Sequence, residues 1–179
     1  MKSHSGFVVW LTGLSGAGKS TLANLIARRL SNERHVIVLD GDEIRAGLCC
    51  DLGYTDKDRK ENIRRISEVA KLCADSGAIV LVAVISPFRH DRSEARAKIK
   101  NQRFMEVFCN CPIEICKERD VKGFYRRALA GEIKNFTGIS SSYEAPTEPD
   151  LVLNTADSLD QCVLTMMNAL VTRGVGVYR

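Results

Sequence analysis

The sequence lacks the features that would place this protein in a membrane or on nucleic acid. Its longest apolar run, residues 78–85, has eight residues, whereas a membrane-spanning helix needs about 20. Aromatic residues make up 6% of the chain, with one tryptophan, and no basic stripe alternates with aromatic side chains, which disfavours nucleic-acid binding. The N-terminus shows no pattern of a secretory signal. We therefore expect a cytoplasmic protein without a membrane or nucleic-acid partner.

Cysteine is present in an odd number and without a metal-binding pattern. The seven are Cys49, Cys50, Cys73, Cys109, Cys111, Cys116 and Cys162. Disulfides are rare in a reducing cytosol, and the Cys109-x-Cys111 pair has neither a second pair nor a nearby histidine, so no zinc site is expected. Most of these thiols should be small buried apolar groups. A redox-sensitive pair stays open, because the sequence does not single one out.

Length and patterning predict one α/β domain over residues 1–179. The chain is 45% hydrophobic and 27% charged, with a net charge of +4, which fits one soluble globular domain that binds a small anion. Strand-like and helix-like segments alternate about five times, and the continuously apolar strands indicate a parallel sheet with helices on both faces. The expected strands are 7–11, 36–39, 78–85, 104–109 and 151–153, and the expected helices are about 19–30, 55–76, 89–100, 112–119 and 158–170.

A phosphate-binding motif follows the first expected strand. Residues 13–20, Gly-Leu-Ser-Gly-Ala-Gly-Lys-Ser, match G-x-x-x-x-G-K-[ST]. The glycines let backbone N–H groups point at phosphate oxygens, and the helix that follows adds its positive dipole end. Lys19 can reach the β- and γ-phosphates, and the Ser20 hydroxyl can bind Mg²⁺. The expected nucleotide site comprises Gly13, Leu14, Ser15, Gly16, Ala17, Gly18, Lys19, Ser20 and Thr21.

The motif alone does not separate a GTPase, an ATPase motor and a small-molecule kinase. The chain has no Asn-Lys-x-Asp motif for reading guanine, and a five-strand domain leaves little room for motor or switch modules. These two features favour the small-molecule kinase.

Charged residues follow the second expected strand. Asp40 and Asp42 can orient Mg²⁺ or accept a proton from an attacking hydroxyl. Arg45 lies three residues beyond Asp42 and can bind a phosphate or sulfate through two hydrogen bonds. The alternative for Asp42 is a solvated turn with a capping aspartate.

The helix expected after residue 55 carries a second group of polar candidates. Thr55 and Asp58 fit an N-terminal capping box. Arg59 and Asn62 are three residues apart and share a helix face. Arg64 and Arg65 follow directly, so at least one arginine should lie on the surface.

Two further segments are candidates for the site. Ser86–Pro87 ends the most apolar strand and is either an acceptor- or metal-binding group or the N-cap and first residue of a helix. Residues 121–145 are too long for an ordinary connection, and they are rich in glycine, basic and aromatic residues. They are expected to form a mobile lid, with a plain surface excursion as the alternative.

The phosphate-binding motif and four further strings occur in one order between residues 6 and 170. These strings are Leu-Asp-Gly-Asp-Glu-Ile-Arg at 39–45, Asp-Arg-Lys-Glu-Asn-Ile-Arg-Arg at 58–65, Ile-Ser-Pro-Phe-Arg at 85–89 and Phe-Thr-Gly-Ile-Ser-Ser-Ser-Tyr-Glu-Ala-Pro at 136–146. Together they resemble the adenylyl-sulfate kinase (APS kinase) family. The resemblance implies a P-loop nucleoside-triphosphate kinase fold, a five-stranded parallel sheet with helices on both faces and a lid segment.

The resemblance also implies a reaction. The family transfers the γ-phosphate of MgATP to the 3′-hydroxyl of adenosine 5′-phosphosulfate (APS), giving 3′-phosphoadenosine 5′-phosphosulfate (PAPS) and ADP in sulfate assimilation. It further implies a homodimer and a separate ATP sulfurylase that supplies APS. The family's catalytic positions correspond to Lys19, Asp40, Asp42 and Ser86, with Ser20 and Asp40 as metal ligands.

Substrate contacts carry over in the same way. Arg45, Arg59 and Asn62 would hold the phosphosulfate and ribose of APS, and Ile85 would contact it through the strand end. Tyr54 and Phe136 would sandwich its adenine, Arg119 would lie near the adenine of ATP, and Asp42, Ser86 and Lys122 would also face the substrate. Which of Asp40 and Asp42 is the base stays open. Ser86 aligns with a serine that the family is often described as phosphorylating, although direct in-line transfer needs no covalent intermediate.

The sequence departs from the family at two places, and other functions are weighed against this one. Tyr54 stands where the family commonly has phenylalanine, and Cys49–Cys50 occupies a usually polar stretch.

A kinase of gluconate or shikimate would leave Tyr54 and Phe136 without a purpose, since those acceptors lack adenine. A silent nucleotide-binding subunit that regulates a sulfurylase is disfavoured by the intact Lys19 and Asp40.

Overall fold

One parallel five-stranded sheet forms the centre of the computed structural model, which describes residues 5–175. The strands are β1 Phe7–Thr12, β2 Val36–Asp40, β3 Ile79–Ala83, β4 Phe104–Asn110 and β5 Leu151–Asn154, in the spatial order β2-β3-β1-β4-β5. All neighbouring strands pair in parallel. The predicted strand count and direction are confirmed, and only β3 is shorter than expected, by one residue at its start and two at its end.

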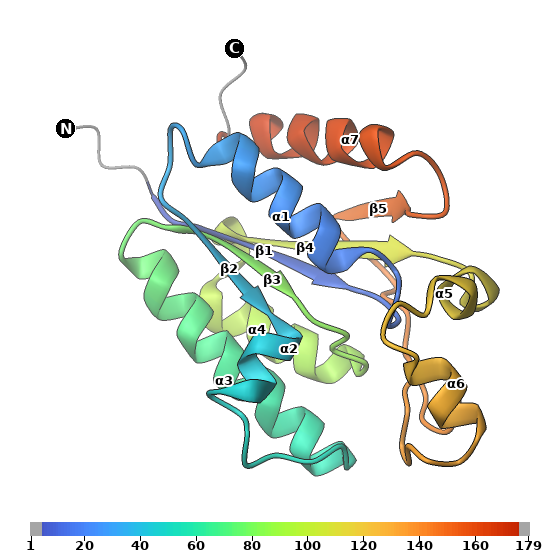
Figure 1. Cartoon of the computed structure of the whole chain (residues 1–179). Helices are drawn as coiled ribbons and strands as arrows, with labels where there is room; N and C mark the ends of the chain where they lie inside the picture. The colour runs from blue at the N-terminus through green and yellow to red at the C-terminus, as the bar shows by residue number, and fades with distance from the viewer. Residues whose placement is uncertain (1–4, 176–179) are drawn as a thin grey trace.

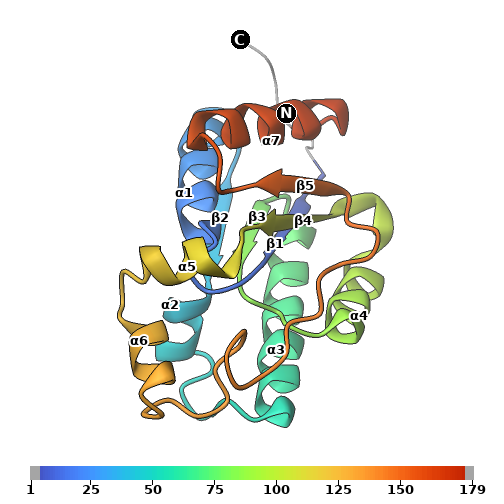
Figure 2. The same ribbon diagram turned by 90° about the vertical axis from the view of Figure 1, so that its right-hand side faces the viewer.

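Helices cover both faces of this sheet, as predicted. The elements are α1 Lys19–Leu30, α2 Gly41–Ala46, α3 Asp56–Asp75, α4 Arg89–Ile99, α5 Ile113–Arg119, α6 Phe124–Leu129 and α7 Leu159–Thr172, with a short 3₁₀ turn at Asn101–Arg103. Figures 1 and 2 show α1 and α7 on one face and α3 and α4 on the other. No helix of the described residues is long and apolar enough to cross a membrane.

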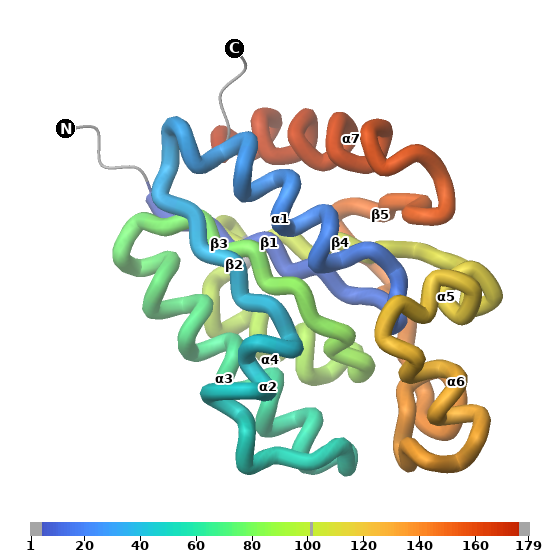
Figure 3. The backbone as a smooth tube through the Cα atoms, in the orientation of Figure 1, coloured from blue at the N-terminus to red at the C-terminus, as the bar shows by residue number. Residues whose placement is uncertain are grey.

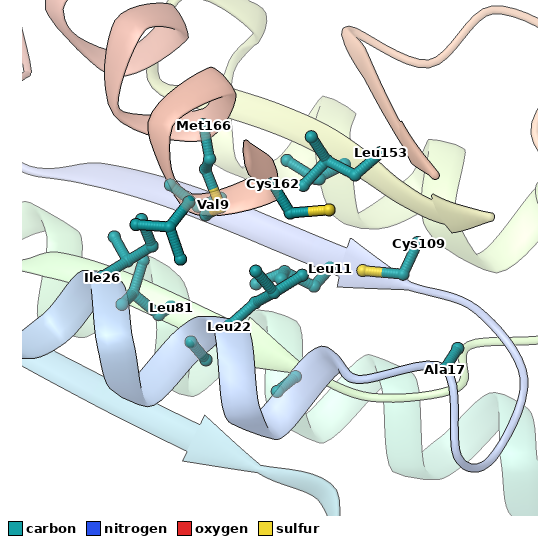
Figure 4. Packing of buried hydrophobic residues seen from close by; sticks show 14 of the residues in the cluster. Val9, Leu11, Ala17, Leu22, Ile26, Leu81, Cys109, Leu153, Cys162 and Met166 are labelled. Atoms are coloured by element: carbon teal, nitrogen blue, oxygen red, sulfur yellow. The ribbon is translucent and has the colours of Figure 1, made fainter. Parts of the chain in front are cut away.

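The side chains of β1 alternate between two apolar clusters. Val9 and Leu11 pack with Leu22, Ile26 and other side chains of the α1/α7 face, as Figure 4 shows. Val8 and Trp10, by contrast, belong to the cluster on the α3/α4 face. All of these side chains are fully buried, and burying one leucine or isoleucine contributes about 1.5–3 kcal/mol. The two-sided core fixes β1 and hence the position of the loop that follows it.

Helix starts were predicted with mixed success. Thr55 Oγ1 accepts a hydrogen bond from the Asp58 N–H at 3.2 Å, and Asp58 Oδ2 accepts one from the Thr55 N–H at 3.3 Å, so the capping box is confirmed. The interpretation of Ser86–Pro87 as a helix start is wrong, because the N-cap of α4 is Phe88. Ser158 is the N-cap of α7, but its side chain makes no capping hydrogen bond.

The predicted excursion of residues 121–145 leads from α5 to β5 by way of a helix that the sequence did not indicate. Figure 3 traces the chain through α6 and back toward the sheet. Gly123, the N-cap of α6, has a φ of 67°, a left-handed conformation that glycine adopts without strain. The described residues place this segment at the carboxyl end of the sheet (Figure 2).

Candidate active site

A cavity of about 780 Å³ lies beyond the carboxyl ends of β1, β2 and β3. All the site residues expected from the sequence line it except Gly13, Leu14 and Ala17. Ala17 belongs to the apolar core, Leu14 packs against that core, and a Cβ at Gly13 would meet the backbone of Cys109. The position of the cavity agrees with the rule that parallel α/β sheets bind ligands at this edge.

Lys19 is held by the backbone of its own loop. Its Nζ donates hydrogen bonds to the carbonyl oxygens of Gly13 at 3.0 Å and Leu14 at 2.7 Å. The side chain is buried, and burial lowers the pKa of this ammonium. Gly13 leaves no room for a side chain, since a Cβ there would lie 2.6 Å from the carbonyl oxygen of Cys109. The loop thus holds a positive charge at the start of α1. The positive end of the helix dipole lies at the same place, so both features favour the binding of an anion there.

Asp40 lies at the end of β2 and joins two parts of the site. Its Oδ2 accepts a hydrogen bond from the Ser20 hydroxyl, and its Oδ1 accepts one from the Asp42 N–H at 2.9 Å. The second bond makes Asp40 the N-cap of α2. The capping role that was the alternative for Asp42 therefore falls on Asp40. Both carboxylate oxygens of Asp40 are engaged, one of them with the serine hydroxyl expected at the metal.

Asp42 faces the cavity from the first turn of α2. Its Oδ2 forms an ion pair with Lys122 Nζ, and both side chains are exposed. This contact joins α2 to the start of the 121–145 segment. Such an exposed pair adds little to stability, so it is well suited to exchange partners when a ligand enters.

Arg45 and Tyr54 both line the cavity and lie against one another. The Arg45 guanidinium carbon lies 4.3 Å from the centre of the Tyr54 ring, and its Nη1 donates to the Gly53 carbonyl at 2.9 Å. Tyr54 is 53% exposed, so its ring presents free surface as well as a cation contact.

Arg59 is buried and ties α3 to the 121–145 segment. It donates to the carbonyl oxygen of Tyr54 at 3.0 Å, to Thr137 Oγ1 at 2.6 Å and to the carbonyl oxygen of Asn135. Burial lowers the pKa of Arg59 from its usual high value. One helical turn on, Asn62 Oδ1 is one of two buried side-chain polar atoms without a partner among the described residues. A buried acceptor that lines the cavity is satisfied when a ligand donates a hydrogen bond to it.

Arg64 and Arg65 both pair with Glu61 and do not line the cavity. Their hydrogen bonds hold the pKa of Glu61 down to about 2. Arg64 is exposed, so the expectation that at least one of these arginines lies on the surface is confirmed.

Phe136 packs edge-on against the Tyr125 ring, with the ring centres 5.0 Å apart. Tyr125 is buried in α6, and its hydroxyl donates to the Ser15 carbonyl at 3.0 Å. The sequence did not single out Tyr125, although it lies in the aromatic-rich stretch. Because Tyr125 contacts both the Phe136 ring and the Ser15 backbone, it connects Phe136 to the phosphate-binding loop.

Ser86 lies at the floor of the cavity and is 2% exposed. Its Oγ accepts a hydrogen bond from Trp10 Nε1 at 3.1 Å, and its φ is 40°. The carbonyl of Ile85 accepts from Thr12 Oγ1 at 2.7 Å. The site interpretation of Ser86 thus has support in its position, while the helix-cap interpretation does not.

Arg119 lies beside the connection from β5 to α7, at the end of the cavity away from Arg45 and Tyr54. Its Nη2 donates to the Thr155 carbonyl at 2.7 Å. The sequence did not indicate four residues that line the cavity at this end, namely Thr155, Asp157, Leu159 and Cys162. The strand-end rule could have found the first two, because they follow β5 directly.

Five of the seven cysteines are buried, as expected. Burial raises the pKa of Cys109 and Cys116 to about 12, and it also raises the pKa of Cys49 and Cys162. At pH 8 these groups are therefore neutral, and a thiol reagent attacks the thiolate.

We expect an aromatic disulfide reagent at pH 8 to modify Cys50, which is exposed, and the half-buried Cys73 within minutes, with the remaining thiols reacting only after denaturation. Release of the coloured thiol, followed by peptide mapping, counts the fast groups. Cys50→Ser should lower the fast count by one. Fast modification of Cys109 or Cys116 in the folded protein would contradict this prediction.

Comparison with known proteins identifies the family to which the chain is similar. The adenylylsulphate kinase family model matches residues 5–154. The chain is 53% identical over 172 residues to an adenylyl-sulfate kinase of Prochlorococcus marinus, covering 95% of this chain and 86% of that protein. It also superposes on the Mycobacterium tuberculosis APS kinase CysC in complex with AMPPNP and APS, with a TM-score of 0.90, 46% identity and coverage of 94% and 99% of the two chains.

A gluconokinase of Sinorhizobium meliloti also has a similar structure, with a TM-score of 0.60, 17% identity and coverage of 96% and 94%. At that identity the likeness shows only the shared P-loop kinase fold. The family match, by contrast, spans most of the described residues and all the site strings. The chain therefore belongs to the adenylyl-sulfate kinase family.

Proposed function

We propose that this chain transfers the γ-phosphate of MgATP to the 3′-hydroxyl of APS, giving PAPS and ADP in sulfate assimilation. The proposal rests on one observation: a single cavity has the phosphate-binding loop at one end and both arginines and aromatic rings at the other. APS carries an anionic phosphosulfate, which arginine binds, and an adenine, which aromatic rings stack on. Gluconate and shikimate have no purine, so they would leave Tyr54 and Phe136 unused.

The nucleotide half of the site follows from the loop 13–20. Its N–H groups and the start of α1 would bind the phosphates of ATP, and Lys19 would move from the Gly13 and Leu14 carbonyls to the β- and γ-phosphates. Arg119 and the residues after β5 would surround the adenine. The AMPPNP found in the mycobacterial kinase supports ATP as the donor.

Ser20 and Asp40 fit the donor set of a Mg²⁺ ion. Their oxygens are already in contact, and hard oxygen donors are what Mg²⁺ prefers. The described residues hold no cluster of three His, Cys, Asp or Glu side chains suited to a metal. The ion would therefore take its other ligands from phosphate and water, and when bound it would neutralise charge on the transferring group.

Asp42 is proposed as the general base. Both oxygens of Asp40 are engaged, whereas the Asp42 side chain is exposed at the cavity and, among the described residues, its carboxylate pairs with the exposed ammonium of Lys122. Asp42 would accept the proton of the 3′-hydroxyl as that oxygen attacks the γ-phosphorus in line. Ser86 is buried and its Oγ is bound by Trp10, so it would shape the acceptor site without becoming phosphorylated.

The 121–145 segment is proposed as a lid. Arg59 binds the second half of this segment through Thr137, and Lys122 joins its beginning to Asp42. On substrate binding, Lys122 would turn from Asp42 to the transferring phosphate and exclude water. The proposal also includes a homodimer in the cytoplasm and a separate ATP sulfurylase as the source of APS, as the family resemblance implies.

The proposed reaction predicts the products of a direct assay. Purified protein, MgATP and APS are mixed, and the nucleotides are separated and identified. We expect a 3′-phosphorylated phosphosulfate and an equal amount of ADP. ADP without that product would indicate another acceptor or bare hydrolysis. Binding of both nucleotides without any ADP would indicate a regulatory subunit, and either result would overturn the proposal.

A further inference from the structure

The turn at residues 85–87, which follows β3 and forms part of the cavity wall, has an unfavourable backbone conformation. Ser86 has a φ of 40°, in the left-handed region that residues with a side chain seldom adopt. Such a conformation persists only where surrounding contacts impose it. Ile85 and Ser86 line the acceptor end of the cavity, so whatever imposes this conformation also sets the shape of that wall.

Arg92 supplies the most direct of these contacts. It extends from the first turn of α4, is 2% exposed and does not line the cavity. Its Nη1 donates to the carbonyl oxygen of Ser86 at 2.6 Å, its Nη2 to that of Glu144 at 2.8 Å, and its Nε to Glu106 Oε1 at 2.7 Å. One planar guanidinium therefore joins the turn, the end of the 121–145 segment and β4.

Neighbouring bonds strengthen the same junction. The Glu144 N–H donates to the carbonyl of Pro87 at 2.9 Å, and Glu144 Oε2 accepts from the Arg89 N–H at 2.8 Å. The 85–87 turn is thereby bound to the end of the 121–145 segment. None of these three hydrogen bonds of Arg92 reaches residues 13–20, where the phosphates of ATP would bind.

We propose that Arg92 is a positioning residue for the acceptor: by holding the Ser86 carbonyl, it fixes the wall that APS contacts without touching APS itself. This inference rests on the proposed function. A lysine at this position keeps the positive charge beside Glu106 but cannot reproduce a planar fork with three separate hydrogen bonds. Loss of the fork should therefore affect the acceptor half and leave the nucleotide half unchanged.

The test compares Arg92→Lys with Arg96→Lys. Arg96 lies one turn along α4 and also pairs with Glu106, but its hydrogen bond goes to the Asp150 side chain rather than to the 85–87 turn. We expect Arg92→Lys to raise KM for APS at least about tenfold and to change KM for ATP by less than about twofold. Arg96→Lys should leave both constants within about twofold of the wild type.

A merely structural role would give a different pattern. It would lower kcat with the folded fraction and leave both KM values unchanged, or raise the two together, and either result would overturn the role of Arg92. If circular dichroism shows that Arg92→Lys does not fold, the double variant Arg92→Gln/Glu106→Gln is tested instead, because it removes both buried charges. We expect it to raise KM for APS and to leave KM for ATP unchanged in the same way. A wild-type protein that does not convert APS would overturn the proposed function and this inference with it.

Discussion

Lys19→Ala should lower kcat for PAPS formation by about 10²- to 10³-fold or more. The Lys19 ammonium is buried at the start of α1, where the phosphates of ATP would bind. Charge develops on the transferring phosphoryl group in the transition state, and a preorganised donor aimed at that charge contributes a factor of this size. The measurement is the rate of PAPS and ADP formation under saturating MgATP and APS.

The variant should remain folded, which separates catalysis from stability. Among the described residues, Lys19 donates to just two carbonyls, both of its own loop, and its removal relieves a buried charge whose pKa is already lowered by burial. Lys71→Ala is the matched control, because Lys71 is on the surface of α3 and pairs with Asp75. We expect the control to keep full activity. A Lys19→Ala enzyme within about tenfold of the wild type would contradict the role assigned to this residue.

The order of the elements could be predicted because each has a local signal. Residues 78–85 are continuously apolar and contain the buried strand β3, and the Thr55/Asp58 pair begins α3 as its spacing indicates. Arg59 and Asn62 were grouped because their spacing places them on one helix face, and both are buried at the cavity. These signals lie within a few residues of one another, so periodicity and capping chemistry suffice to read them.

The missed residues act through long-range contacts. Tyr125 meets Ser15 across 110 positions, and Thr12 meets Tyr143 across 131. Arg92 falls within the expected helix 89–100 without a local sign that its side chain is buried. No local pattern encodes which distant carbonyl a side chain will reach. The sheet topology determines these contacts, because the order β2-β3-β1-β4-β5 brings residues from several strand ends to one edge.

Asp42→Asn should lower kcat by about 10²- to 10⁴-fold at neutral pH, the contribution typical of a positioned base. Asparagine has the size of aspartate and still accepts a hydrogen bond from Lys122, but its amide cannot take the proton of the 3′-hydroxyl. We therefore expect KM for ATP and for APS to change by only about a factor of a few. The measurement is steady-state PAPS formation with each substrate varied in turn.

Two companion variants decide between the carboxylates. Glu43→Gln changes the adjacent exposed side chain of α2, which does not line the cavity, and should keep full activity. Asp40→Asn should lose activity at low Mg²⁺ and recover part of it as Mg²⁺ is raised, because its carboxylate adjoins the Ser20 hydroxyl. Asp42→Asn should gain nothing from added Mg²⁺, since it lacks the base and not the metal. The reverse pattern, an active Asp42→Asn beside an Asp40→Asn that no Mg²⁺ concentration restores, would make Asp40 the base.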